Sequence, residues 1–196
     1  MLRLGVIERN ALGSRVQRWF RRLLRRPAPQ DIMKIMRYRP ALYGGPLLAL
    51  KHAAFRHSTS WSVEEEELFA AFVARMKQCE ICTVLHALHA AGQEGPGRVA
   101  VAAALADWRS AGLRPPVAAA FRALEALVQD TATFSAADLQ ELRALGVPRG
   151  AIEDLLYIST VMSIMVRIGN ALGARLDSTY AVAVRQFGLR STTPAT

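Results

Sequence analysis

The sequence predicts an all-α protein, and three observations support this class. Apolar residues make up 52% of the 196 residues, with alanine, leucine and arginine recurring at helical spacing. Alternating strand-like runs and the Asn-Gly or Asp-Gly turns that close hairpins are missing. Gly, Pro and Ser/Thr positions divide the chain into helix-sized segments. A chain of this length buries about two-thirds of its unfolded surface, so we expect one compact core.

The positive charge is confined to the first part of the chain. Residues 1–40 hold 11 of the 25 basic side chains and 2 of the 16 acidic ones, so the remainder is neutral. Within 12–26, apolar residues recur at helical spacing between arginines, which predicts a basic amphipathic helix ending at Pro27. We assign residues 1–29 to this helix and a linker. Its apolar stripe is expected to pack on the protein; an anionic membrane is an open alternative, and no nucleic-acid-binding motif is present.

The helical domain is expected over residues 30–188, followed by a disordered tail over 189–196. Asp31 can cap the first turn of the domain, and Ser62 with Glu65 forms a capping box at the start of a longer helix. A turn is expected after Asp31 and ends at Pro40. The expected helices, delimited by glycine, proline and capping residues, cover 47–55, 62–91, 98–110, 116–129, 136–145 and 148–174.

The cellular setting is predicted from what the chain does not contain. No segment reaches the roughly 18 uninterrupted apolar residues that cross a bilayer. Residues 1–10 carry charges and no apolar stretch, unlike a secretory signal. We therefore expect a cytoplasmic protein without a transmembrane span. The only cysteines, Cys79 and Cys82, lie three residues apart, which in a reducing compartment indicates a redox-active or metal-binding pair.

A possible catalytic cluster follows from the helical periodicity of this segment. At about 100° per residue, Cys79, Cys82 and His86 fall within a stripe roughly 60° wide and share one helix face. A nearby imidazole or a helix N-terminus lowers the pKa of a thiol and so supplies a reactive thiolate. A thiolate attacks the O–O bond of a peroxide to give a sulfenic acid, which the second cysteine converts to a disulfide.

Glu67 is the candidate carboxylate for orienting the imidazole, but it lies twelve residues before Cys79. In one straight helix the two would be about 18 Å apart along the axis. A relay therefore requires a break, which we predict around Lys77 and Gln78, placing Cys79 at a helix N-terminus. Helix-start electrostatics is the alternative explanation for Glu67.

Two other interpretations of the cysteine pair stay open at this point. One is a zinc site using both cysteines, His86 and a fourth ligand such as His89 or Glu67. The other is a buried, inert pair of thiols. His89, His52 and His57 are interpreted as surface or packing histidines.

The spacing of these residues resembles the active-site motif of the alkylhydroperoxidase D and carboxymuconolactone decarboxylase superfamily. The motif is Glu67, eleven residues, Cys79-Glu80-Ile81-Cys82, three residues and His86. Flanking segments are similar to the peroxidase-related branch, namely MRYRP at 36–40, SVE at 62–64, LFAAFV at 68–73 and ALGV at 144–147. The resemblance covers roughly residues 30–180 and implies an all-helical fold that assembles into dimers, trimers or hexamers.

The resemblance also implies an activity and residue roles. Cys82 would be the attacking thiolate and Cys79 the resolving cysteine, while His86 and Glu67 relay the proton. Electrons would return from a dithiol partner such as a lipoylated protein, and no cofactor is expected. Members with the fullest relay carry a second histidine directly before the latter cysteine, where this chain has Ile81. The alternatives are the decarboxylase or isomerase branch, and a non-catalytic interaction protein working through the basic helix.

Overall fold

The computed structural model describes residues 3–4, 31–55, 60–92 and 97–189. Every regular element in these ranges is helical, which confirms the predicted all-α class. The predicted basic helix over 12–26 lies outside the described residues, as does almost all of the predicted tail.

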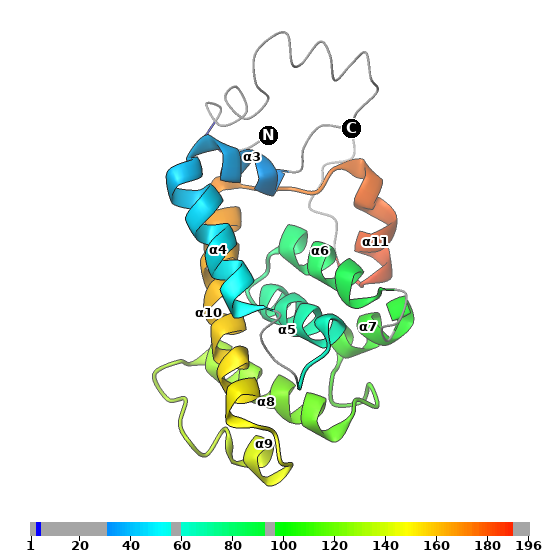
Figure 1. Cartoon of the computed structure of the whole chain (residues 1–196). Coiled ribbons are helices and arrows are strands. Elements are labelled where there is room, and N and C mark those ends of the chain that lie inside the picture. The colour runs from blue at the N-terminus through cyan, green and yellow to red at the C-terminus, as the bar shows by residue number, and fades with distance from the viewer. Residues whose placement is uncertain (1–2, 5–30, 56–59, 93–96, 190–196) are drawn as a thin grey trace.

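Two consecutive helices, α5 (Val63–Met76) and α6 (Glu80–Ala90), occupy the middle of the molecule (Figure 1). The predicted capping box starts α5: the Glu65 amide donates to the Ser62 hydroxyl, and the Ser62 amide donates to the Glu65 carboxylate. From Glu66 to Ala74 every residue of α5 is buried, because α5 contacts α6, α8 (Pro115–Gln129) and α10 (Arg149–Leu172). This makes α5 the central helix of the fold.

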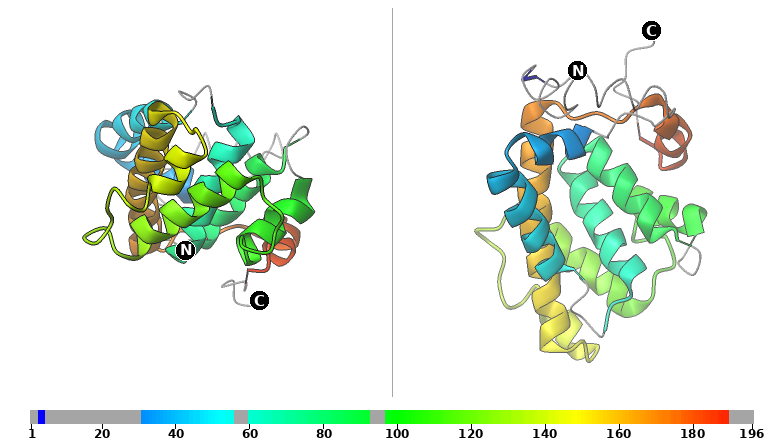
Figure 2. Two further views of the ribbon diagram at one scale, coloured as in Figure 1. Left: turned by 90° about the horizontal axis from the view of Figure 1, so that it is seen from below. Right: turned by 45° about the horizontal axis from the view of Figure 1, so that its top comes forward.

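The longest helix, α10 (Arg149–Leu172), runs along one side of this pair, and α4 (Gly45–Ala54) lies against it (Figure 2). By length and composition α10 is the one described helix that could cross a membrane. Eleven of its residues are buried, in contact with α4, α5, α6 and α8, so it forms a wall of the protein core. It ends at Gly173, whose left-handed backbone, with φ of 70°, terminates the helix.

The remaining elements lie around the central helices. They are α3 (Asp31–Tyr38), a π-helix η1 (Pro40–Gly44), α7 (Gly97–Ala106), α8 (Pro115–Gln129), α9 (Gln140–Ala144), a 3-10 turn η2 (Ser178–Tyr180) and α11 (Ala181–Gln186). The helix expected to begin at Leu47 is preceded by further helical turns, because η1 leads directly into α4 at Gly45.

Two predicted helices are shorter than expected, and one was not predicted. The helix expected over 98–110 ends at Ala106, and that over 136–145 begins only at Gln140. In the second case, the Asp138 carboxylate accepts hydrogen bonds from the amide and hydroxyl of Ser135 and stabilises a turn there. The short helix α11 has too few residues for a clear hydrophobic period.

Aromatic side chains fill the core beneath α5. Phe121 of α8 packs against Phe72, with ring centroids 4.5 Å apart, and against Phe69 at 5.9 Å. Trp61 meets Phe69 edge to face and donates its indole N–H to the Ala151 carbonyl of α10 at 2.9 Å. This packing fixes α5 relative to α8 and α10, and therefore fixes the helix that carries Glu67.

Candidate active site

The predicted break between α5 and α6 is confirmed. Helix α5 ends at Met76, and Gln78 has a φ of 55°, the left-handed conformation that reverses the chain direction. Cys79 then becomes the N-cap residue of α6, also as predicted. Because the chain turns back here, residues far apart along α5 and α6 come to face one another.

The turn at the break is held by α10. The side-chain amide of Asn170 donates a hydrogen bond to the Lys77 carbonyl at 3.1 Å. The neighbouring Gly169 is buried, and a Cβ added there would lie 3.6 Å from the Cys79 sulfur. The start of α6 and its first cysteine therefore sit directly against this part of α10.

Both cysteines are free thiols and both are buried, Cys79 with 1% and Cys82 with 4% of its surface exposed. The Cys79 carbonyl accepts hydrogen bonds from the Thr83 amide and the Thr83 hydroxyl, which continue the first turn of α6. The two side chains are near enough for each to shift the pKa of the other. The pair is thus shielded from bulk water and its two ionisations depend on one another.

The interaction between the two side chains shifts their pKa values in opposite directions. The pKa of Cys79 is lowered, chiefly by the hydrogen bond from the Cys82 side chain and also by the Cys82 backbone N–H, although burial opposes the shift. The pKa of Cys82 is raised well above its ordinary value by the same bond and by burial. At rest the negative charge is therefore favoured on Cys79, while Cys82 keeps its proton.

The structure brings Glu67 and His86 into direct contact, although 19 residues separate them. Their side chains are buried, and His86 Nδ1 lies 2.5 Å from Glu67 Oε2. Burial lowers the pKa of His86, whereas the bond to Glu67 acts to raise it. Burial acts to raise the pKa of Glu67, but its hydrogen bonds to His86 and His89 hold it far below the ordinary range. We assign an ionised Glu67 that accepts from Nδ1–H of a neutral His86, leaving Nε2 as the basic nitrogen.

His89 is an exposed histidine, in line with its interpretation from the sequence, but its contact with Glu67 was not predicted. Its side chain is 65% exposed, yet its Nδ1 lies 3.6 Å from the same Glu67 oxygen that meets His86. The available signal was the three-residue spacing from His86, which puts both imidazoles on one face of α6. Ile81, at the position where the fullest relays carry a second histidine, is instead buried in the core.

Residues from α4 complete the surroundings of His86. Phe55 stacks on the imidazole, with ring centroids 5.9 Å apart and planes 26° from parallel. The ammonium of Lys51 lies 5.2 Å from the centre of the Phe55 ring. Its positive charge helps to lower the pKa of Glu67, of His86 and of Cys82. The cysteines, Glu67 and His86 are therefore buried, with the cation of Lys51 close enough to shift the ionisation of three of these four groups.

Two solved structures have a similar overall fold. One is described as the alkylhydroperoxidase AhpD core, an uncharacterized peroxidase-related protein from Ralstonia eutropha JMP134. It matches with a TM-score of 0.71 and 17% identity, over 84% of this chain and 85% of that one. The chain has the alkylhydroperoxidase D fold. The resemblance predicted from the sequence is therefore confirmed for the fold.

Another solved structure with a similar fold is an uncharacterized peroxidase-related protein from Silicibacter sp. TM1040. Its TM-score is also 0.71 at 17% identity, over 86% of this chain and 88% of that one. No family model and no curated protein matches the sequence. This chain is thus similar to the two proteins in the arrangement of its helices, while its sequence identity to them is low.

The zinc alternative finds no support in the geometry. Across 3–4, 31–55, 60–92 and 97–189, no three His, Cys, Asp or Glu side chains are grouped as metal ligands. Within this alkylhydroperoxidase D fold, Glu67 Oε2 instead lies 2.5 Å from His86 Nδ1, and both cysteines are free thiols. The roles of Cys79, Cys82, His86 and Glu67 stay predictions, developed below.

Proposed function

We propose that the protein is a thiol-dependent hydroperoxide reductase that uses Cys79 and Cys82. The observation that carries this proposal is the contact between His86 Nδ1 and Glu67 at 2.5 Å, one helical turn after Cys82. A thiol, a neutral imidazole and a carboxylate in this order form an activated nucleophile of the type found in thiol and serine enzymes. The peroxidase-related descriptions of the two structural neighbours are consistent with it.

In the first step the sulfur of Cys82 attacks the terminal oxygen of a hydroperoxide. The raised pKa of Cys82 means that this thiol needs a base, and His86 Nε2 accepts its proton. The S–O bond forms as the O–O bond breaks, giving a sulfenic acid on Cys82. The leaving alkoxide takes the proton from His86 and departs as an alcohol, so the charge balances.

In the second step Cys79 resolves the intermediate. Its lowered pKa makes it the thiolate that attacks the sulfenic acid on Cys82. A disulfide forms between the two cysteines, and hydroxide leaves and is protonated to water. Reduction then requires two electrons from outside the chain, which we assign to a dithiol or lipoylated protein by thiol–disulfide exchange.

His89 gives the buried relay an outlet to solvent. Glu67 Oε2 faces the buried His86 and the exposed His89 at 2.5 Å and 3.6 Å. We assign to His89 the positioning of Glu67 and the exchange of protons between the relay and bulk water. A buried acid–base pair without such a contact would exchange protons only when the site opens.

The decisive experiment measures peroxide reduction coupled to a dithiol, with hydrogen peroxide, cumene hydroperoxide and a fatty-acid hydroperoxide as substrates. We expect turnover in the wild type and none in Cys82→Ser. The matched variant Cys79→Ser is expected to consume one equivalent of peroxide and to stop as a sulfenic acid on Cys82, detected by trapping and mass spectrometry.

Two outcomes would contradict these assignments. Turnover that survives Cys82→Ser would overturn the peroxidase mechanism. A trapped sulfenic acid on Cys79 in Cys82→Ser, together with an inert Cys79→Ser, would exchange the roles of the two cysteines. In that case the thiolate favoured at rest attacks the peroxide directly.

We also propose that the protein is a cytoplasmic homo-oligomer. Large apolar side chains of α4 and α10 are exposed, and two of them, Leu50 and Tyr157, lie together at one apolar hollow between these helices. Exposed apolar patches of this kind are typical of subunit contacts. Light scattering in solution is expected to give a mass above 21.5 kDa, and Leu50→Glu with Tyr157→Glu to give a smaller species. A wild-type monomer would contradict this assembly.

A further inference from the structure

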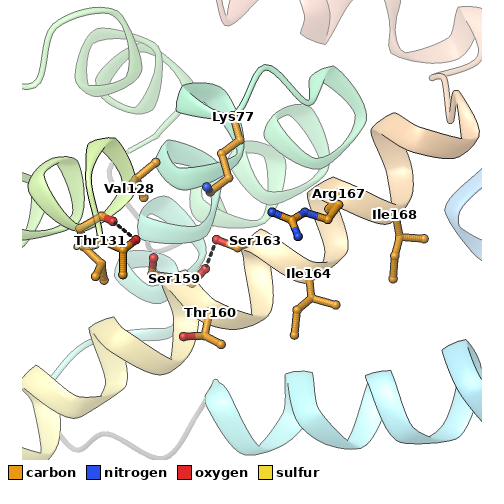
Figure 3. Close-up of a pocket in the computed structure, with 10 residues that line it drawn as sticks. Lys77, Val128, Thr131, Ser159, Thr160, Ser163, Ile164, Arg167 and Ile168 are labelled. Atoms are coloured by element: carbon orange, nitrogen blue, oxygen red, sulfur yellow. Dashed lines mark hydrogen bonds between the residues drawn. The ribbon is translucent and has the colours of Figure 1, made fainter.

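A pocket separate from the cysteine pair lies between α8 and α10, next to the end of α5 (Figure 3). Its volume of about 380 Å³ lies in the lower range of small-molecule sites. The apolar part of its lining consists of Leu127, Val128, Ile164 and Ile168. None of the ten lining residues is acidic.

Two cations define one end of this pocket. Lys77 and Arg167 extend from different elements toward the same side of α10, with Ser163 between them (Figure 3). Within the described ranges, no acidic side chain forms an ion pair with either cation. Two neighbouring positive charges repel one another, and an anion between them removes that repulsion. Arg167 also presents a planar fork that fits carboxylate or phosphate oxygens.

Three of the four hydroxyl groups that line the pocket do not compete for this role. Ser163, Thr160 and Thr131 donate their protons to backbone carbonyls one helical turn earlier. Their oxygens therefore present lone pairs to the pocket, and the charged donors are Lys77 and Arg167. An anionic group bound here would depend on these two side chains.

The charged end of the pocket is tied to the turn that carries Cys79. Lys77 lies two residues before Cys79, and its carbonyl is the one that Asn170 holds. Arg167 lies two residues before Gly169, which faces the Cys79 sulfur. A ligand at the two cations would therefore touch both segments that position this cysteine.

We propose that this pocket binds a small amphipathic anion, with a carboxylate or phosphate head group between Lys77 and Arg167 and a short apolar chain against Leu127, Val128 and Ile164. Both head groups carry the oxygens that a guanidinium and an ammonium recognise. Binding of the anion does not require peroxidase activity, so either property can be present without the other.

The test is isothermal titration of the full-length protein with octanoate and with octyl phosphate. Octanol provides the chain without the charge, and acetate and inorganic phosphate provide the charge without the chain. We expect both octyl anions to bind and the three reference compounds to bind at least about tenfold more weakly, since each lacks one of the two interactions. Titrating Cys79→Ser/Cys82→Ser in parallel is expected to give the same affinities.

Lys77→Gln/Arg167→Gln is expected to weaken the binding of both anions at least about tenfold. Arg98→Gln/Arg185→Gln removes the same charge from exposed arginines that do not line the pocket, and is expected to bind like the wild type. Lys77→Arg/Arg167→Lys, which keeps both charges, is expected to retain most of the affinity. Absence of binding, equal weakening in the two charge-removing variants, or octanol binding as tightly as octanoate would each overturn the proposal.

Discussion

At the scale of single residues, one carboxylate oxygen contacts two imidazoles with opposite surroundings. Glu67 Oε2 meets the buried His86 and the exposed His89, so one histidine is sheltered from solvent and the other exchanges freely with it. Burial keeps the pKa of His86 below its ordinary value of about 6.5. His86 is therefore neutral at pH 7 and able to act as a base.

This assignment predicts the pH dependence of peroxide reduction. Activity needs neutral His86, so kcat/KM is expected to fall as the pH drops through a pKa below 6.5. In Glu67→Gln the bond and charge that raise the His86 pKa are lost, so the acid limb is expected to move to still lower pH. The rate at neutral pH is expected to fall about 100-fold, since the imidazole loses its orienting partner.

The control for this pH profile is Glu64→Gln, another carboxylate in the first turn of α5. It is expected to leave both the acid limb and the rate unchanged. An acid limb of Glu67→Gln that moves to higher pH would contradict the assignment, because it would show that Glu67 does not raise the His86 pKa.

The proton outlet predicts a different signature for His89. His89→Ala is expected to lower kcat several-fold in dilute buffer, because protons leave the buried relay more slowly. Added imidazole is expected to restore much of that rate, as an external carrier replaces the missing side chain. His52→Ala, which alters a histidine on α4, serves as the control and is expected to show no rescue. A His89→Ala enzyme insensitive to buffer concentration would exclude the outlet.

At the scale of elements, the break at Gln78 is the feature on which the site depends. A residue other than glycine in the left-handed region costs about 1–2 kcal/mol, and the contacts of α6 and α10 offset that cost. Three residues of non-helical chain thereby convert one long helix into two that face each other.

Substitutions at Gln78 measure the free-energy cost of its left-handed backbone conformation. Gln78→Gly is expected to raise the free energy of unfolding by about 0.5–1 kcal/mol, because glycine adopts a positive φ without strain. Gln78→Val is expected to lower it by about 1–2 kcal/mol. Denaturant titration checks both, with the helical Gln140→Gly as a control that should destabilise. A destabilised Gln78→Gly would show that the left-handed turn is not the strained element.

The break between α5 and α6 could be predicted from the sequence because the proposed proton relay requires Glu67 to lie near the cysteine pair. A straight helix would have kept Glu67 too far from Cys79, so the relay itself required a turn near Lys77 and Gln78. The end of the helix expected over 98–110 and the start of that expected over 136–145 carried no such constraint. There local hydrogen bonding, such as that between Ser135 and Asp138, competes with helix at similar free energy and decides the boundary.

At the scale of the whole molecule, the aromatic cluster under α5 connects stability to the site. Phe121 contacts Phe69, Phe72 and Trp108, and it is completely buried. Phe121→Ala is expected to lower the free energy of unfolding by about 3–5 kcal/mol, whereas Phe121→Leu should cost less because it leaves a smaller cavity. Thermal or denaturant unfolding measures both, and equal effects would indicate that the core collapses around the smaller side chain.

The helical fold class could be predicted from the spacing of residues in the sequence, but the contact partners of individual side chains could not. The all-α class and the Glu67, Cys79, Cys82 and His86 spacing were visible in the sequence. The contact between His89 and Glu67 and the pocket at Lys77 and Arg167 were not, because they depend on how α5, α8 and α10 pack. Helical periodicity gives the face on which a residue lies and leaves open what covers that face.

Because of the left-handed turn, the effect of an inserted residue depends strongly on where in the chain it is placed. One residue inserted between Glu67 and His86 would rotate one of them by about 100° about its helix axis and displace it by about 1.5 Å. The proposed relay would then lose its contact even though Glu67, Cys79, Cys82 and His86 were all retained. An insertion between α8 and α9 would leave this distance unaltered. The 19-residue interval from Glu67 to His86 therefore acts as a fixed length, whereas the connection between α8 and α9 is free to vary.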